Sequence, residues 1–334
     1  MQAFRRAVTA LGHELVAGGN PDHVDLTLTI DGREVRIALD SAAVITPDVV
    51  ARMVARPERR PSSVLHIAVG DLITRAARDA LRDANWGWLD RRGHLVIRTE
   101  GVHIDADVPP DERLIVESRK VISGAAAISW AVALLLSPDD PPSMREVARR
   151  ASLSHSAIVP AAKRLRAASL VRADGRPLVP ELFWALAEVW SSTWVPLAEV
   201  PSVGDGESYA SLGVNVDRDD PGWAVAGTVG AVAWGAPVAI GRAYPPDFYV
   251  PSLAIVRQAT LRLGQASRFE DRACTVALAP TPLVCGTRYV RASDEWGHWR
   301  FAHGLIAALD LAQDRARGAE ILAGWKPKDF TRVW

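Results

Sequence analysis

A helical pattern followed by a short turn, at residues 143–178, constrains the fold of this 334-residue chain more than any other feature. Ser143 and Ser154 each precede a helical run, and a serine at that position accepts hydrogen bonds from the free N–H groups of the first turn. The apolar run ISWAVALLL supplies an earlier helix, and Ser152 lies in the turn between the second and third helices. Asp174-Gly175 then favours a tight turn between two short β segments. The stretch therefore predicts three helices followed by a β-hairpin, which is the arrangement of a winged helix.

The charge of this stretch favours a nucleic-acid partner. The chain as a whole is neutral, with 39 basic and 39 acidic residues, so that any affinity for a polyanion must come from local clustering. Between residues 119 and 176 the basic side chains exceed the acidic ones by about six. Lys163, Arg164, Arg149 and Arg150 are expected to contact the DNA backbone. The full set of cations expected to bind DNA is Arg145, Arg149, Arg150, Lys163, Arg164, Arg166, Arg172 and Arg176.

The start of the third helix is expected to face the bases. Ser154, His155 and Ser156 lie there, where a recognition helix contacts base edges in the major groove. Arg176 lies at the tip of the predicted hairpin, next to Pro177, and is placed to enter an adjacent minor groove. Pro160 opposes this interpretation, because proline inside a helix removes a hydrogen bond and bends the helix, or shifts its start beyond Ser154. An alternative interpretation is a protein-interaction module in which the arginines only solvate a helix face.

Three domains are expected from the pattern of the whole chain, which is α+β overall. Residues 1–110 alternate strands and helices, with a hairpin at VDLTLTI and VRIALD, a buried strand at VLHIAV, a helix at DLITRAARDALRDA and two short strands after it. Residues 111–190 hold the predicted winged helix. Residues 191–334 mix strands, such as RACTVALA and PLVCGTRYV, with one final helix, GLIAALDLAQDRARGAEILAGW.

The first domain resembles the restriction-endonuclease-like fold, in which acidic residues and a lysine on neighbouring strands hold a metal ion. Pro21-Asp22 and Asp25 open the first strand of the hairpin, and Asp40-Ser41-Ala42 stands where that fold has an acid-x-Lys triplet. Alanine replaces the lysine, so the resemblance implies a degenerate domain that binds without cleaving. The three acids are then expected to be surface or turn carboxylates.

The string WGWLDRRGHL, at residues 86–95, leaves two interpretations open. Trp86 and Trp88 could stack on the bases of a nucleic acid while Arg91 and Arg92 grip its backbone. Alternatively, the tryptophans form a hydrophobic clasp below a charged hairpin tip.

The third domain resembles the nucleotidyltransferase pattern, a helix start rich in small residues followed by an Asp-x-Asp pair on a strand. Gly227-Thr228 and Asp247 match this pattern, but Tyr249 stands in place of the second carboxylate. Two-metal chemistry needs closely placed acids, so the resemblance implies a domain without transferase activity. On the final helix, Asp310 and its neighbours Asp314, Arg317 and Glu320 are expected to form surface salt links.

Metal and cofactor sites are not expected. Cys274 and Cys285 have apolar or small neighbours, as reduced core thiols do. His298 and His303 lack a further ligand at metal-binding spacing. The longest apolar run, at residues 125–136, is shorter than the roughly 20 residues of a membrane span, and the N-terminus is expected to be an amphipathic helix, so a cytoplasmic protein without membrane contact is expected.

The winged helix together with the third domain, including YPPDFYVP and LIAALDLAQDRARGAEILAGW, resembles the type IV abortive-infection antitoxin (AbiEi-like) family of transcriptional regulators. The resemblance covers residues 120–326, and the domain at 1–110 departs from the simplest members. It implies a non-enzymatic, sequence-specific DNA-binding protein with double-stranded DNA as partner, a possible homodimer and a possible cognate toxin. The alternatives are a metal-dependent nuclease or nucleotidyltransferase acting on nucleic acid, and the protein-interaction module.

Overall fold

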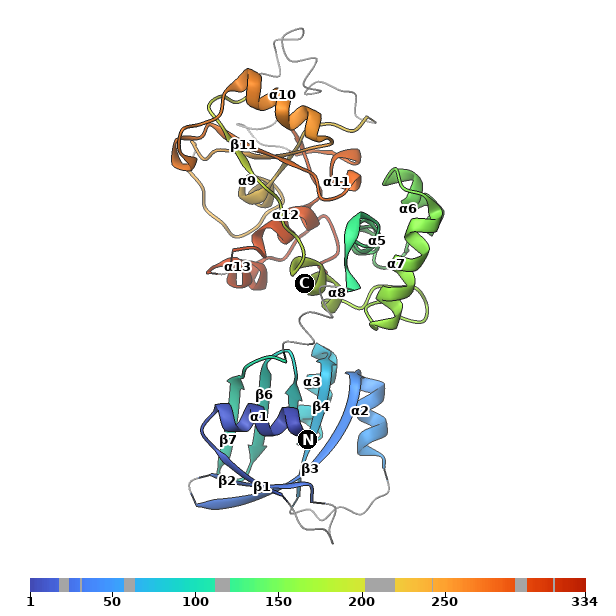
Figure 1. The fold of residues 1–334 in the computed structure, drawn as a ribbon, viewed down its shortest axis with the longest axis vertical. Helices are drawn as coiled ribbons and strands as arrows, with labels where there is room; N and C mark the ends of the chain where they lie inside the picture. Colours follow the sequence, from blue (N-terminus) through green and yellow to red (C-terminus); the bar gives the residue numbers. More distant parts are fainter. Residues whose placement is uncertain are drawn as a thin grey trace. The chain divides into compact units, whose positions relative to one another are not determined.

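The computed structural model describes residues 1–17, 24–30, 32–56, 64–111, 121–201, 220–241, 243–291, 299–314 and 316–334. These residues form a mixed α and β protein with two sheets (Figure 1). The chain divides into two compact units, Met1–Ser118 and Arg119–Trp334. The boundary expected at residue 110 lies near the end of the first unit, and no boundary between units falls at residue 190.

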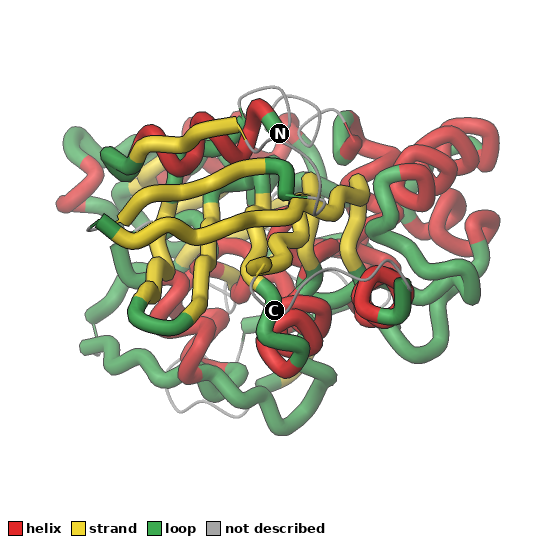
Figure 2. The backbone as a smooth tube through the Cα atoms, turned by 90° about the horizontal axis from the view of Figure 1, so that it is seen from below, coloured by secondary structure: helices red, strands yellow, loops and turns green. Residues whose placement is uncertain are grey.

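The first unit is a seven-stranded sheet whose strands lie side by side in chain order (yellow in Figure 2). Strands β3 and β4, and likewise β4 and β5, are parallel, whereas the other neighbours are antiparallel. The elements are α1 (Gln2–Ala10), β1 (Glu14–Ala17), β2 (Leu26–Ile30), β3 (Arg33–Ile45), α2 (Pro47–Val54), β4 (Val64–Ile73), α3 (Arg75–Asp83), β5 (Gly87–Asp90), β6 (His94–Thr99) and β7 (Val102–Asp107).

The predictions for this unit hold in part. The hairpin at VDLTLTI and VRIALD is β2 and β3, and the strand at VLHIAV is part of β4. The prediction of two further strands after α3 was wrong, because β5, β6 and β7 follow it. The helix expected from Asp71 begins only at Arg75, because Asp71–Ile73 continue β4 alongside β3.

The two faces of this sheet carry separate cores. Helix α1 buries Phe4 and Val8 against one face, together with alternate residues of β2, β3 and β4. Helices α2 and α3 cover the other face, where Met53 and Leu81 pack around Trp88. The helices therefore lie on both sides of the sheet, as Figure 1 also shows.

The second unit combines a helical part with a six-stranded sheet of order β12-β13-β9-β10-β11-β8. One hydrophobic core includes residues of both parts, which explains why they form a single unit. The helices are α5 (Gly124–Leu136), α6 (Met144–Arg150), α7 (His155–Ala167), α8 (Glu181–Ala187), α9 (Gly227–Ala233), α10 (Leu253–Leu263), α11 (Pro282–Gly286), α12 (Gly304–Leu311) and α13 (Gly318–Gly324), with a 3-10 turn at Phe269–Asp271. The strands are β8 (Val195–Leu197), β9 (Ala224–Ala226), β10 (Asp247–Val250), β11 (Cys274–Leu278), β12 (Tyr289–Val290) and β13 (Arg300–Phe301).

Two predictions for the second unit hold only in part. The segment PLVCGTRYV was expected to be a strand, but only Tyr289–Val290 form one, β12. Pro282–Gly286 form α11 because Thr281 caps it and Pro282 occupies its first turn. The single final helix is broken into α12 and α13. The break has a local cause, since the Asp314 carboxylate accepts hydrogen bonds from the backbone N–H groups of Ala316 and Arg317.

A membrane span was not expected, and among the described residues no helix combines the length and the apolar character that crossing a bilayer requires.

Candidate nucleic-acid interface

Helices α5, α6 and α7 form a packed three-helix unit with the caps that the sequence predicts. The Ser143 hydroxyl accepts a hydrogen bond from the N–H of Glu146, and the Ser154 hydroxyl accepts one from the N–H of Ala157, both at 3.2 Å. Val147, Ile158 and Leu165 are fully buried in the core that these helices share. Helix α7 therefore starts where the sequence places it, directly after Ser154.

Helix α7 continues through Pro160 as one element, from His155 to Ala167. The proline has no N–H group, so the carbonyl of Ser156 receives no hydrogen bond from it. Its ring lies on the exposed face of the helix, opposite the face that buries Ile158 and Leu165. Pro160 thus neither delays the start of α7 nor ends it.

Ten of the eleven predicted DNA contacts are exposed, and the other, Arg150, is half-buried. The exposed ones are Ser154, His155, Ser156, Lys163, Arg164 and Arg166 around α7, Arg145 and Arg149 on α6, and Arg172 and Arg176 after α7. In Figure 1, α6 and α7 form the outer side of this helical part. Arg119 and Lys120, which were counted in the basic cluster, lie outside the described residues.

Two of these cations have partners within the unit. Arg150 donates to the hydroxyl of Thr287 at 3.1 Å and lies 3.8 Å from the carboxylate of Glu146. Arg164 donates to the backbone carbonyl of Ser123 at 3.4 Å. Among the described residues the other six cations form no ion pair, so their charge is available to an external anion. Arg150 thus fastens α6 to the segment that follows α11, which makes its guanidinium less available to DNA than the other six cations.

A hydrogen-bonded hairpin follows α7. The N–H of Arg172 donates to the carbonyl of Arg176 at 2.8 Å, the N–H of Gly175 donates to the carbonyl of Arg172 at 3.0 Å, and the N–H of Leu178 donates to the carbonyl of Leu170 at 2.9 Å. Gly175 adopts φ +89°, the left-handed value that closes a three-residue loop of this kind. The turn predicted at Asp174-Gly175 is therefore confirmed, and it carries an arginine at each side.

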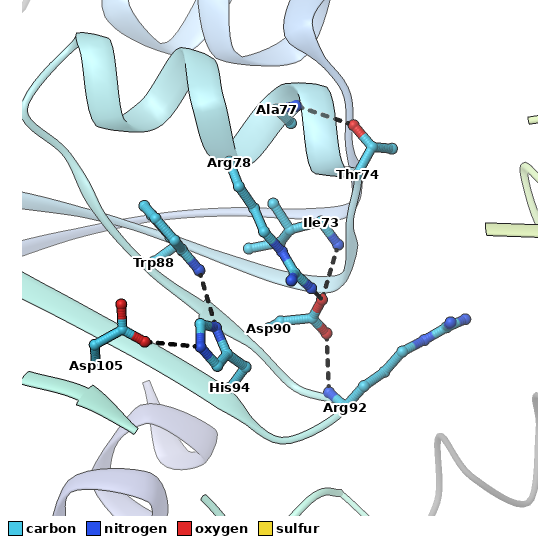
Figure 3. A network of polar contacts seen from close by, with 9 residues as sticks. All are labelled: Ile73, Thr74, Ala77, Arg78, Trp88, Asp90, Arg92, His94 and Asp105. Carbon is cyan, nitrogen blue, oxygen red and sulfur yellow. Dashed lines mark hydrogen bonds and ion pairs between the residues drawn. The ribbon is translucent and has the colours of Figure 1, made fainter. Parts of the chain in front are cut away.

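The string WGWLDRRGHL forms a buried clasp, so base stacking by its tryptophans was the wrong interpretation. Trp86 and Trp88 are only 8% and 2% exposed, and neither can receive a base. The buried Asp90 fixes the hairpin by accepting hydrogen bonds from the N–H of Ile73, the guanidinium of Arg78 and the N–H of Arg92 (Figure 3). The tryptophans of this string therefore contribute packing, as the interpretation of a hydrophobic clasp expects.

Arg91, at the same tip, lies in a cavity of about 680 Å³ on the α1 side of the first sheet. Its guanidinium donates to Asp111 at 2.6 Å and also to Asp71. The hydrogen bond to Asp111 raises the pKa of Arg91 above its ordinary value. Because two carboxylates neutralise this arginine, the cavity is a weaker candidate for phosphate binding than the exposed cations around α7.

The two described acids of the degenerate nuclease site, Asp25 and Asp40, have separate partners. Asp25 accepts a hydrogen bond from the N–H of Leu39 at 2.7 Å. Asp40 was expected at the surface or in a turn, but it is 4% exposed and pairs with Arg56 at 3.2 Å. Asp22 lies outside the described residues, and within the described part of the chain no group of three or more His, Cys, Asp or Glu side chains could hold a metal ion.

Asp310 is the residue whose role sequence reasoning missed. Instead of forming a surface salt link, its carboxylate accepts hydrogen bonds from the Trp190 indole at 2.8 Å, the Tyr249 phenol at 2.7 Å and the N–H of Gly227 at 3.0 Å. Burial raises the pKa of Asp310 to about 6, although these three hydrogen bonds oppose the shift. The one sequence signal is an acid inside the apolar run LIAALDL. Asp310 joins the end of the helical part to the sheet.

Asp247 and Tyr249, which resemble the nucleotidyltransferase pattern, lie beside the Asp310 carboxylate. Asp247 accepts a hydrogen bond from the hydroxyl of Thr275 at 2.5 Å, and burial raises its pKa. Burial also raises the pKa of Tyr249 well above its ordinary value, which keeps the phenol protonated and donating. Both oxygens of Asp310 are therefore already engaged by protein donors, which leaves Asp247 as the neighbouring acid for any metal ion.

The raised pKa of Asp310 predicts a pH-dependent stability. The unfolded chain holds this proton with the ordinary pKa of 3.8, so the contribution is present below about pH 4 and is lost as the pH rises through about 6. Lowering the pH from about 7.5 to about 5 is expected to stabilise the wild type, relative to Asp310→Asn, by about 1.4 kcal/mol. Urea unfolding of both proteins at each pH measures this difference, and equal pH dependence in the two would contradict it.

Comparison of the chain with protein-family models, with curated proteins and with solved structures finds no match.

Proposed function

We propose that this protein is a sequence-specific DNA-binding protein without catalytic activity, acting as a transcriptional regulator of the antitoxin type. The observation that carries the proposal is the set of six cations around α6, α7 and the hairpin that are exposed and unpaired among the described residues. Residues 143–178 hold eight basic and two acidic side chains, a net charge of +6 in a neutral chain. Such an island attracts phosphates, and its partner must be strongly anionic.

The local architecture supports a winged helix as the DNA-binding element. Three packed helices precede a hairpin closed by Arg172 and Arg176, and the third helix exposes the polar residues His155 and Ser156 at its start. In that arrangement the third helix enters the major groove while the cations contact phosphates. Substitution of these side chains therefore tests the proposed DNA binding.

The two flanking sheets fit the proposed binding-only role. The order of helix α1, the antiparallel strands β1 to β3, helix α2 and the parallel strand β4 is consistent with a restriction-endonuclease-like domain, whose lysine position is Ala42. The turn at Gly227 beside Asp247 is consistent with a nucleotidyltransferase-like domain that has Tyr249 in place of its second acid. The role of an antitoxin and the cognate toxin stay predictions, and a neighbouring gene for a nucleotidyltransferase would support both.

One observation favours a second candidate function, nucleotidyl transfer. Asp247 and Asp310 both lie beside Gly227 at the start of α9, so a second carboxylate, from α12, is close to Asp247, although its oxygens accept hydrogen bonds from Trp190, Tyr249 and Gly227. Incubation of the full chain with Mg²⁺, labelled nucleoside triphosphates and RNA or DNA tests this candidate. Label transfer that Asp247→Ala abolishes would establish it, whereas the leading proposal expects none.

Selection from a random pool of DNA duplexes tests the leading proposal. We expect the full chain to enrich a defined sequence. The logarithm of its affinity for the selected duplex should fall against the logarithm of salt concentration with a slope of roughly −4 to −6, because four to seven phosphates are contacted. Anisotropy titrations at several salt concentrations measure the slope. The proposal fails if no duplex binds even at low salt.

A further inference from the structure

The exposed face of α7 offers few groups that read bases. The residues opposite its buried face are Ser156, Pro160, Lys163 and Ala167. In the first two turns, from His155 to Ala161, no arginine, asparagine or glutamine is present. These are the side chains that form paired hydrogen bonds with guanine or adenine. The Ser156 hydroxyl is already hydrogen-bonded to that of Ser154 at 2.9 Å. Helix α7 therefore offers few side chains that could distinguish one base pair from another.

The hairpin instead presents two arginines as a fixed pair. Arg172 and Arg176 are joined by a backbone hydrogen bond across the hairpin, so their side chains start about 5 Å apart on one face. Val171 and Pro177, the next pair inward, are buried, which turns the arginine pair outward. Both arginines are exposed, and neither has an ion pair among the described residues.

The position of Arg172 opposite Arg176 destabilises the hairpin unless an anion binds to the pair. Like charges directly opposite each other across a hairpin destabilise it. Among the described residues Asp174 forms no salt bridge with either arginine, and its carboxylate accepts a hydrogen bond from the backbone N–H of Arg176 at 3.1 Å, which stabilises the turn. The hairpin is thus a hydrogen-bonded support that holds two guanidinium groups outward.

From this we infer that the protein selects its DNA largely through Arg172 and Arg176, which recognise a narrow, A·T-rich minor groove beside the segment contacted by α7. This inference rests on the proposed DNA-binding function. A narrow minor groove concentrates negative potential and attracts arginine, whose guanidinium loses its hydration more easily than the ammonium of lysine. Guanine adds an amino group to the minor groove, which blocks and widens this site.

Base analogues in the selected duplex separate minor-groove from major-groove reading. Inosine is guanine without the 2-amino group, so an I·C pair has the minor-groove groups of A·T and the major-groove groups of G·C. Replacing the A·T flank with G·C is expected to weaken binding roughly tenfold, and replacing it with I·C is expected to weaken it less than twofold. If I·C weakens binding as much as G·C, the flank is read in the major groove and the inference is overturned.

Two charge-conserving variants assign the effect to the hairpin. Arg172→Lys with Arg176→Lys is expected to reduce the A·T over G·C preference to about twofold or less, because lysine keeps the charge but not the weak hydration. Arg145→Lys with Arg149→Lys, the matched control on α6, is expected to keep the full preference. An unchanged preference in the hairpin variant, or a selected duplex without an A·T flank, would contradict the inference while leaving DNA binding established. Absence of any binding would instead remove the proposed function.

Discussion

Replacing Lys163, Arg164 and Arg166 with glutamate is expected to weaken binding to the selected duplex more than roughly a hundredfold at moderate salt. All three side chains are exposed on α7, so the change leaves its buried face intact. Each replacement removes an attractive phosphate contact and adds a repulsive one, and the slope of affinity against salt is expected to fall by about three. Fluorescence anisotropy with a labelled duplex measures both quantities.

A control with the same change in charge is available in the same unit. Arg257, Lys326 and Lys328 are exposed and lie outside the three-helix unit, and their replacement by glutamate changes the net charge equally. The affinity of this control for the selected duplex is expected to lie within about threefold of the wild-type affinity. The reason is that the long-range electrostatic attraction from the net charge contributes less to binding than direct phosphate contacts do. Equal losses in the two variants would assign the effect to net charge. Wild-type binding by the α7 variant, with an unchanged circular dichroism spectrum, would refute the proposed interface.

Replacing Gly318 with alanine is expected to destabilise the protein by about 3 kcal/mol, although alanine is the better helix former. Gly318 is the first residue of α13, and a Cβ atom there would lie well inside contact distance of the Leu311 carbonyl oxygen. That oxygen belongs to the backbone at the end of α12 and cannot move without separating the two helices. Urea unfolding monitored by tryptophan fluorescence measures the loss.

Gly324, at the other end of α13, is the matched control. A Cβ atom there would meet its nearest neighbour, Cγ of Pro237, at 3.5 Å, which is an ordinary contact. Gly324→Ala is expected to change the free energy of unfolding by less than about 1 kcal/mol, in the stabilising direction that helix propensity predicts. A Gly318→Ala protein as stable as the wild type would mean that α12 and α13 form one continuous helix.

The three-helix unit could be predicted from the sequence because its signals are local. Ser143 and Ser154 act on N–H groups only three residues away, and Gly175 supplies the left-handed backbone of its own turn. Exposure of the predicted DNA contacts also followed, because the charged and apolar positions of α7 alternate at helical spacing. Arg150 is the exception, since its partner Thr287 is 137 residues away in the chain.

The roles of several other side chains were decided by contacts between distant segments. The sequence pattern predicts that Asp310 lies on a helix surface. In the structure its carboxylate accepts hydrogen bonds from Trp190 and Gly227, which are 120 and 83 residues away in the chain. The sequence allows Trp86 and Trp88 to be either stacking or packing residues. The structure decides for packing, because α2 and α3 cover the face of the sheet on which both tryptophans lie. A sequence pattern fixes which groups can cap a helix or close a turn, because those hydrogen bonds span a few residues. Which carboxylate is buried depends on the segments that pack against it, and only the tertiary structure brings those together.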